Sequence, residues 1–404
     1  KFRLLLFFFK VAFMVERIAK KTLLRLASQF PVVAITGPRQ SGKSTLAKMT
    51  FPQKKYITMD DKSLREIAKA NPNDFLLAFP DGAIIDEVQK VPELFDAIKN
   101  YVDNTKFEAG KFILTGSSQF KLKENISDSL AGRVAFIKLL PFSIDELKLT
   151  EKMEENPYQV ILKGNYPPLY DSEKKFIPED WFENYIETYL DLDVKEHINI
   201  SNLHTFKKFV QICALYSGQM LSMDSIARNL GISAPTVKLW LSILESSYII
   251  HLLEPDFDNL GKALVKTPKL YFIDTGLLCN LLRITTMEDL ILSQHRGAIV
   301  ETFAISELLK YRFNQGRKAN LSFFRDSKGF EVDTIANWNH TFAIEIKSSI
   351  ETEEKLSANT KKYLNLRNDK NCKGAIFYLG NISLTVNGIK YVSWRDWGNF
   401  IDEG

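Results

Sequence analysis

The sequence predicts an α/β protein in three parts: a core with a parallel β-sheet, a winged helix-turn-helix domain, and a second α/β domain. Over residues 14–150, short apolar runs that end in polar residues alternate with helical segments, which is typical of parallel sheets with helices on both faces. A helix-turn-helix spacing lies in the middle of the chain. In the last third, a polar turn separates two runs of alternating polarity.

The chain has 404 residues, enough for two to four domains with sizeable cores. Hydrophobic residues make up 45% and charged residues 25%, as in ordinary soluble proteins. The net charge of +4 is too small to indicate a nucleic-acid partner by itself. Cys213, Cys279 and Cys372 are far apart, which favours a reducing compartment and no cysteine-based metal site.

Residues 1–13 are interpreted as an extension or a misassigned start, because Met14 precedes an ordinary polar sequence. The apolar run from Leu4 to Phe9 is too short for a membrane span or a secretory leader. We therefore expect a cytoplasmic protein without a stable membrane span. A membrane-surface anchor, as in a transport or membrane-associated ATPase, is the alternative.

The strongest motif lies between an apolar run at 32–36 and a helix that starts near Ser44. It reads Gly37-Pro38-Arg39-Gln40-Ser41-Gly42-Lys43-Ser44, followed by Thr45. The two glycines allow the backbone to curl so that its N–H groups point at phosphate oxygens. Lys43 can reach the β- and γ-phosphates, and the Ser44 hydroxyl can ligate Mg²⁺. We expect this P-loop to bind ATP or GTP, with ATP and Mg²⁺ as the cofactors.

Two acidic residues follow the apolar run at 83–85. Ligands of parallel sheets bind at the carboxyl ends of the strands. We therefore expect Asp86 to hold Mg²⁺, directly or through water, and Glu87 to orient or deprotonate the attacking water. Alternatively, the two acids only begin a helix.

The apolar run at 111–115 ends in hydroxyl residues, namely Thr115, Ser117 and Ser118. They are candidates to sense the γ-phosphate. A turn capped by hydroxyls is the alternative. Arg133 follows in Leu130-Ala131-Gly132-Arg133. It is expected either to reach a phosphate, in cis or from an adjacent subunit, or to form a surface salt bridge.

The set GPRQSGKST, AIIDEVQ, ILTGSS, LAGR and PFSIDEL resembles the ATPase core of a large prokaryotic AAA+-type family. The resemblance extends from Met14 to about Ser349, through GNYP, YIETYLDLDV, KLYFIDTGL and EVD…EIK. It implies an AAA+-like P-loop NTPase core over 14–150 and a C-terminal domain of unknown function. Gly164-Asn165 stands where the family often has two glycines.

Residues 151–200 are expected to form a helical connector whose aromatic side chains pack in the core, with a stacking platform for bases as the alternative. Residues 201–262 are interpreted as the winged helix-turn-helix domain: helices at 222–230 and 235–246 around a turn at 231–233, then wing strands at 248–257. The second helix carries Lys238 but few other basic residues. DNA contact and protein docking therefore both stay open.

Residues 263–404 are expected to form the last domain. An amphipathic helix at 297–310 carries Glu301. A hairpin of the runs 330–335 and 342–347, symmetric about Asn339, places Asp333 opposite Glu345 and Glu331 opposite Lys347. Two such carboxylates repel unless a cation bridges them, so Asp333 and Glu345 outline a Mg²⁺ site.

This pattern resembles the active site of the PD-(D/E)xK nucleases, which belongs to a restriction-endonuclease-like α/β fold. The resemblance implies catalytic roles for Glu301, Asp333, Glu345 and Lys347. A solvated hairpin face with a Glu331–Lys347 pair is the alternative. We expect an ATPase that couples its nucleotide state to action on DNA or RNA, with a homo-oligomer among its assemblies. The alternative is a nucleotide-dependent switch that binds a protein partner through a catalytically idle nuclease-like domain.

Overall fold

The structure, a computed structural model, describes residues 15–117, 130–150, 152–189, 203–256, 266–398 and 400. The segment 1–13 and the candidate Ser118 lie outside the described residues. Within these ranges, no helix combines the length and the apolar character needed to cross a membrane.

The first sheet is the predicted parallel core. Its strands are β1 (Val32–Thr36), β2 (Lys55–Thr58), β3 (Ala83–Asp86), β4 (Phe112–Gly116) and β5 (Val134–Lys138). They lie in the order β2-β3-β4-β1-β5, and every neighbouring pair is parallel. The expected α/β fold with a parallel sheet is therefore confirmed. Because these strands are parallel, β1, which leads to Gly37, and β3, which leads to Asp86 and Glu87, end at the same edge of the sheet. Strand β4 lies between them.

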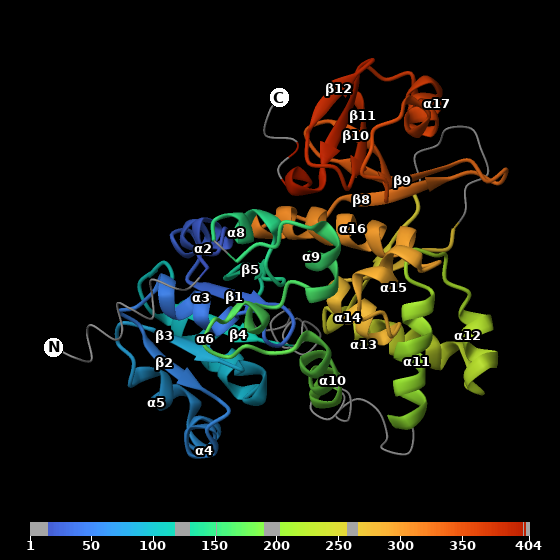
Figure 1. The fold of residues 1–404 in the computed structure, drawn as a ribbon. Helices are drawn as coiled ribbons and strands as arrows, with labels where there is room; N and C mark the ends of the chain where they lie inside the picture. The colour runs from blue at the N-terminus through green and yellow to red at the C-terminus, as the bar shows by residue number, and fades with distance from the viewer. Residues whose placement is uncertain are drawn as a thin grey trace.

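Helices cover both faces of this sheet (Figure 1). One face packs against α2 (Ala19–Ala27) and α3 (Lys43–Thr50), the other against α4 (Lys62–Ala70), α5 (Pro72–Leu77) and α6 (Glu93–Asn104). Side chains alternate along a strand, so Val33 joins Leu23 and Leu46 on the first face while Val32 joins Phe95 on the second. Each β1 side chain is thus buried whichever way it points.

Helices dominate the middle of the chain. They are α8 (Ile144–Lys148), α9 (Pro157–Lys163), α10 (Pro178–Tyr189), α11 (Leu203–Leu215), α12 (Met223–Leu230) and α13 (Ala234–Ser246). The aromatic side chains of α10 are buried, as expected for core residues: Trp181, Phe182, Tyr185 and Tyr189. Gly231, in the left-handed conformation, ends α12, and the Ser233 side chain caps α13 by accepting from the Thr236 N–H.

The strand after α13 pairs outside the expected wing. Strand β6 (Ile250–Leu253) is antiparallel to β7 (Lys269–Phe272), whereas both wing strands were predicted within 248–257. This pairing spans the boundary expected between residues 262 and 263, and Phe257 lies outside the described residues. Helices α14 (Thr275–Leu281), α15 (Met287–Leu292) and α16 (Arg296–Asn314) follow β7.

The C-terminal sheet is mixed. It comprises β8 (Leu321–Arg325), β9 (Glu331–Asn337), β10 (Thr341–Lys347), β11 (Cys372–Tyr378), β12 (Leu384–Val386) and β13 (Ile389–Ser393), in the order β12-β13-β11-β10-β9-β8. Helix α17 (Ala358–Arg367) covers one face. Short 3₁₀ helices occur at η1 (Val88–Lys90), η2 (Pro167–Tyr170), η5 (Glu354–Ser357) and η6 (Trp394–Asp396).

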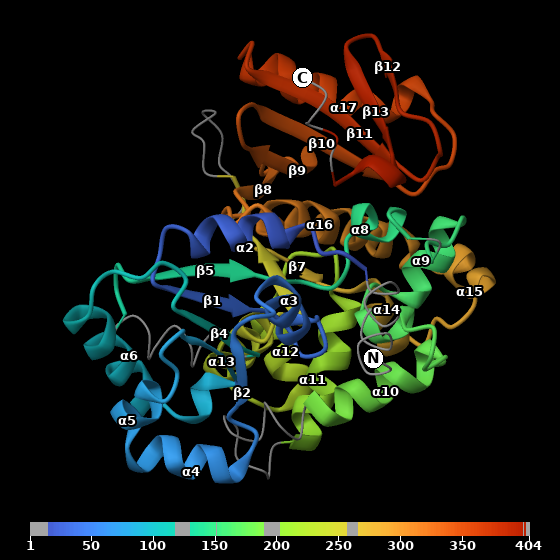
Figure 2. The same cartoon turned by 90° about the vertical axis from the view of Figure 1, so that its left-hand side faces the viewer.

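Helix α16 lies between the two sheets (Figure 1 and Figure 2). The sequence predicted an amphipathic helix, but from residue 299 to 314 all side chains except Glu301 and Tyr311 are at least nine-tenths buried. The reason is that α16 packs against β5 and α2 of the parallel core and against β7 and β10. One hydrophobic core therefore runs from α8 through α16 into the C-terminal sheet.

Candidate functional site

The predicted P-loop connects β1 to α3. Gly37, Gln40 and Gly42 all have positive φ angles, of 154°, 64° and 91°. A side chain at Gly37 would collide with the Leu139 carbonyl oxygen. The Lys43 ammonium donates to the carbonyl oxygens of Gly37, at 2.9 Å, and Pro38, at 2.7 Å. The loop therefore curls around its own ammonium, in the place where a phosphate would be held.

The Asp86 carboxylate meets this loop at the end of β3. Ser44 Oγ donates to Asp86 Oδ1 at 2.7 Å, and Thr115 donates to the same oxygen. The Tyr56 hydroxyl donates to Asp86 Oδ2 at 2.6 Å. Burial, and to a lesser degree this hydrogen bond, raises the pKa of Tyr56. The Ser44 and Asp86 oxygens have the donor chemistry that Mg²⁺ prefers, with water and phosphates left to complete the shell. The pair therefore fits a magnesium ion.

Glu87, the next residue, adopts a strained backbone with φ of 53°. Such strain in a non-glycine residue concentrates at functional sites. Glu87 Oε2 accepts from Gln89 at 2.5 Å and from Ser117 Oγ at 3.4 Å. Burial raises the pKa of Glu87 despite the opposing attraction of Lys43 and Arg39. The Glu87 carboxylate therefore lies near the Lys43 and Arg39 cations beside the P-loop. Its raised pKa nevertheless leaves it able to accept a proton, as a general base must.

Arg133 is not brought to this site. It precedes β5 at the amino end of the sheet, where its carbonyl accepts from the Val32 N–H, and its guanidinium pairs with Asp103 at 2.5 Å. The P-loop lies at the opposite edge, about 16 Å away for a five-residue strand. Arg133 therefore cannot reach a phosphate held by the P-loop of its own chain. Its pair with Asp103 is the surface salt bridge that the sequence offered as the alternative.

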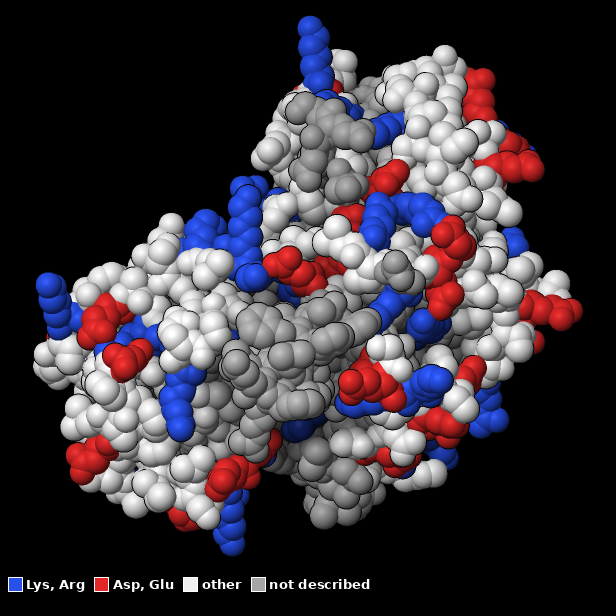
Figure 3. All heavy atoms as spheres, turned by 60° about the vertical axis from the view of Figure 1, so that its left-hand side comes forward, with Lys and Arg blue, Asp and Glu red and all other residues white. Residues whose placement is uncertain are grey.

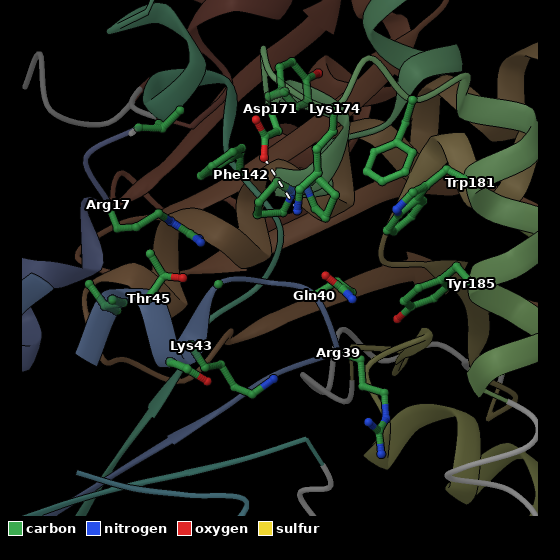
Figure 4. A pocket seen from close by; sticks show the side chains of 18 of the residues that line it. Arg17, Arg39, Gln40, Lys43, Thr45, Phe142, Asp171, Lys174, Trp181 and Tyr185 are labelled. Atoms are coloured by element: carbon green, nitrogen blue, oxygen red, sulfur yellow. Dashed lines mark ion pairs between the residues drawn. The ribbon is translucent and has the colours of Figure 1, made fainter. Parts of the chain in front are cut away.

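A cavity of about 1370 Å³ opens beside the loop. Figure 4 shows Gln40 and Lys43 from the loop and Trp181 and Tyr185 from α10 around it. Arg39, Gly42, Ser44, Thr45 and Glu87 also line it. The rings of Trp181 and Tyr185 stack with centroids 5.0 Å apart. Ligand pockets usually measure about 300–1,000 Å³, so this cavity has room for a nucleotide.

The second predicted cluster forms around β9 and β10. Thr341 lies opposite Asn337 and Ile344 opposite Thr334, which is the predicted register about Asn339. Asp333 Oδ2 accepts from the Ile346 N–H at 2.8 Å. Lys347 Nζ lies 2.6 Å from Glu345 and 4.0 Å from Asp333. The structure thus brings these three residues together.

The Glu331–Lys347 pair of the alternative interpretation does not form. Glu331 instead pairs with Arg325 at 2.7 Å and with Lys269. Lys269 also lies 3.0 Å from Glu301, and the Tyr271 hydroxyl donates to Glu301. Burial raises the pKa of Glu301 to about 7. Lys269 belongs to the KLYFIDTGL segment but was not identified as a site residue, because its partners lie more than 30 positions away.

Comparison with known proteins matches three parts of the chain. The family described as AAA domain matches residues 29–148. Residues 29–148 therefore correspond to an AAA domain. Two families described as "Domain of unknown function (DUF8612)" and "Domain of unknown function (DUF4143)" match residues 154–288 and 296–397.

Two curated relatives are the Uncharacterized protein Rv2008c of Mycobacterium tuberculosis and the Uncharacterized protein Mb2031c of Mycobacterium bovis. Each is 30% identical over 294 residues, covering 72% of this chain and 65% of the relative. The chain therefore spans just under two thirds of the length of these relatives.

Among solved structures, the Walker-type ATPase PABY2304 of Pyrococcus abyssi gives a TM-score of 0.45 at 16% identity, covering 67% of this chain and 96% of that one. AMPPCP-bound DnaA of Aquifex aeolicus gives 0.29 at 16% identity, covering 56% and 86%. Both TM-scores are below 0.5.

A buried arginine that the sequence did not single out braces the P-loop of the AAA domain. Arg17 donates to the Ser41 carbonyl at 2.7 Å and to the Leu140 carbonyl at 2.7 Å. Its Nε lies 2.9 Å from Glu146 on α8, and these side chains are 7% and 0% exposed. Glu146 is 129 positions away along the chain, which is why no local pattern revealed the pair.

We expect Arg17→Met to lower the free energy of unfolding by about 3–5 kcal/mol, because it leaves the Glu146 carboxylate buried without a counter-ion. Urea unfolding measures the loss. The matched control is Lys20→Met, whose ion pair with Glu16 is exposed and should contribute at most about 1 kcal/mol. Equal losses in the two variants would contradict a bracing role for Arg17.

Proposed function

We propose that the protein binds ATP together with Mg²⁺ at the P-loop and hydrolyses it. The observation that carries this proposal is that Lys43 and Ser44 of the loop meet Asp86, the last residue of β3, and Glu87, the residue after it, at one edge of the sheet. The backbone N–H groups of the loop bind the phosphates, and the Lys43 ammonium transfers from the loop carbonyls to phosphate oxygens. Phosphate release from MgATP tests the proposal.

The other roles follow from the same contacts. Ser44 and Asp86 would hold Mg²⁺, which neutralises charge on the β- and γ-phosphates. Glu87 orients the attacking water and accepts its proton. Ser117 donates to Glu87 and thereby positions it. Gln40, Arg39 and Thr45 border the cavity that takes the rest of the nucleotide.

We propose further that the nucleotide state of the AAA domain controls the C-terminal half of the chain. Two buried contacts support such coupling. Thr36, the last residue before the loop, is hydrogen-bonded to the Tyr248 hydroxyl after α13 at 2.6 Å. On the other side, Glu307 of α16 accepts from the Ile144 N–H at 2.8 Å and pairs with Lys310. Both contacts join the parallel core and its following helix directly to elements later in the chain.

For the C-terminal half, we propose a helix-turn-helix unit formed by α12 and α13 and a nuclease-like arrangement around Asp333 and Glu345, acting on DNA or RNA. The hairpin register and the α12–α13 turn support this reading. On the face drawn in Figure 3, however, basic side chains are interspersed with acidic ones, which favours weak rather than strong phosphate attraction.

Cleavage of labelled DNA and RNA with Mn²⁺ tests the nuclease reading. If Asp333 and Glu345 act on phosphodiesters, product should form with the parent chain, and Asp333→Ala should reduce it by about 10²-fold or more. Asp369→Ala, at an exposed position after α17, is the control. Equal cleavage by the parent and Asp333→Ala would assign the product to a contaminant.

A second candidate function is a nucleotide-dependent switch that binds a protein partner while its nuclease-like site stays idle. The observation that favours it is the buried Lys269 ammonium within the acidic cluster. Under this candidate, the parent chain cleaves neither DNA nor RNA, while ATP turnover persists.

A further inference from the structure

Lys269 occupies the centre of the acidic cluster. It projects from β7, and its side chain is 3% exposed. Its ammonium contacts Glu301 of α16 at 3.0 Å and Glu331 of β9. Tyr271, two residues along and therefore on the same face of β7, donates to Glu301. Two elements from different parts of the chain, α16 and β9, thus converge on one lysine of β7.

The remaining carboxylates have their own cation. Lys347 pairs with Glu345 and lies near Asp333, as described above. Arg325 pairs with Glu331 from the other side. Three cations therefore face four carboxylates. One polar atom is left over: Glu345 Oε1 is buried and has no hydrogen-bond partner among the described residues, and Glu345 itself is only 2% exposed.

The residues present do not fit the Mg²⁺ ion that a nuclease-like site implies. Magnesium requires near-octahedral coordination by oxygens at about 2.0–2.1 Å. Here the two expected ligands, Asp333 and Glu345, lie 4.0 Å and 2.6 Å from the Lys347 ammonium. Glu301 and Glu331 converge on the Lys269 ammonium. Within the described ranges, no three acidic, histidine or cysteine side chains are grouped so that they could hold a metal ion.

The lysine also keeps its charge. Burial alone would lower the pKa of Lys269, but attraction to Glu301, Glu331 and Asp333 outweighs this effect and raises it. A buried ammonium is costly unless it is fully paired, and here it is paired twice.

We propose that Lys269 is a built-in cation that takes the place of a divalent metal in this site, so that the C-terminal half needs no metal to hold its acidic residues together. The Lys269 ammonium also links the β6–β7 strand pair to two other elements. Its partners are Glu301 of α16 and Glu331 of the C-terminal sheet. The site is then a junction between parts of the chain, as in the second candidate function, in which the nuclease-like site is idle. Metal-dependent cleavage of DNA or RNA that is lost in Asp333→Ala would contradict this proposal.

Binding of Mn²⁺ to the full chain, counted by electron paramagnetic resonance without nucleotide, tests this proposal. All proteins carry Ser44→Ala and Asp86→Asn, because these two side chains are the ones proposed to hold a metal ion at the P-loop. The chain with only these two substitutions is the parent background. The parent background and Lys269→Arg, which keeps the charge, should bind no Mn²⁺ tightly. Lys269→Met should gain one Mn²⁺ per chain, and its melting temperature should rise by a few degrees when the ion is added.

The gained site should disappear when Asp333→Asn is added to Lys269→Met. Tight binding of one Mn²⁺ to the parent background, abolished by Asp333→Asn, would overturn the proposal. A folded Lys269→Met chain that gains no Mn²⁺ would also overturn it. If Lys269→Met does not fold, the number of Mn²⁺ ions bound per chain of the parent background decides alone: none supports the proposal, and one overturns it. None of these outcomes depends on ATP hydrolysis, so they remain distinct from the test of the proposed ATPase.

Discussion

Lys43→Ala should reduce ATP turnover by at least about 10²-fold, because it removes the one ammonium that the loop is built around. That ammonium contacts the Gly37 and Pro38 carbonyls, and it is the only Lys43 atom that can carry charge to a phosphoryl group. Losing one preorganised charge from a transition-state site costs about 10²–10³-fold in rate. Phosphate release measured against ATP concentration gives both kcat and KM.

The matched control is Lys69→Ala, an exposed lysine on α4 of the same domain. It should hydrolyse ATP like the parent chain, which would exclude a general effect of lost positive charge. Parent-like turnover by Lys43→Ala would contradict the assignment of the loop as the phosphate site.

Glu87→Gln should separate binding from chemistry. The amide keeps the size and polarity of the side chain but cannot accept a proton, so turnover should fall by about 10²–10⁴-fold. The affinity for MgATP should stay within a few-fold of the parent value, because the loop and the Ser44–Asp86 pair are unchanged. Single-turnover hydrolysis and equilibrium binding with labelled ATP measure the two quantities.

The same residue predicts a pH dependence. Because burial raises the pKa of Glu87, its carboxylate becomes protonated at a higher pH than an exposed glutamate does. Turnover by the parent chain should therefore fall as the pH drops through that raised pKa. Glu93→Gln, at an exposed position that begins α6, should keep the parent rate and pH profile. Parent-like turnover by Glu87→Gln would remove Glu87 from the mechanism.

The sequence was sufficient where the determinants are local. The P-loop is a contiguous motif, and Asp86 and Glu87 follow directly from a buried strand. The β9–β10 register followed from a symmetric polar turn, because side-chain alternation fixes which residues can face each other. In these cases the chain between the relevant residues is short, so its geometry is almost fixed by the pattern.

Long-range contacts were not predictable in this way. Arg17 finds Glu146, and Lys269 finds Glu331, only because the tertiary fold brings distant segments together. Helix α16 was misjudged for the same reason. Its pattern does not reveal that the parallel core packs on one side and the C-terminal sheet on the other. Arg133 was placed by its position in the motif order, which says nothing about the edge of the sheet on which it lies.

The central claim is that the P-loop holds a nucleoside triphosphate with its main-chain amides and the Lys43 ammonium. Calorimetric titration of the chain with MgATP tests this claim most directly. We predict saturable binding of one nucleotide per chain, lost in Lys43→Ala and retained in Lys69→Ala. No heat of binding with either MgATP or MgGTP, at protein concentrations that reveal micromolar affinity, would contradict it.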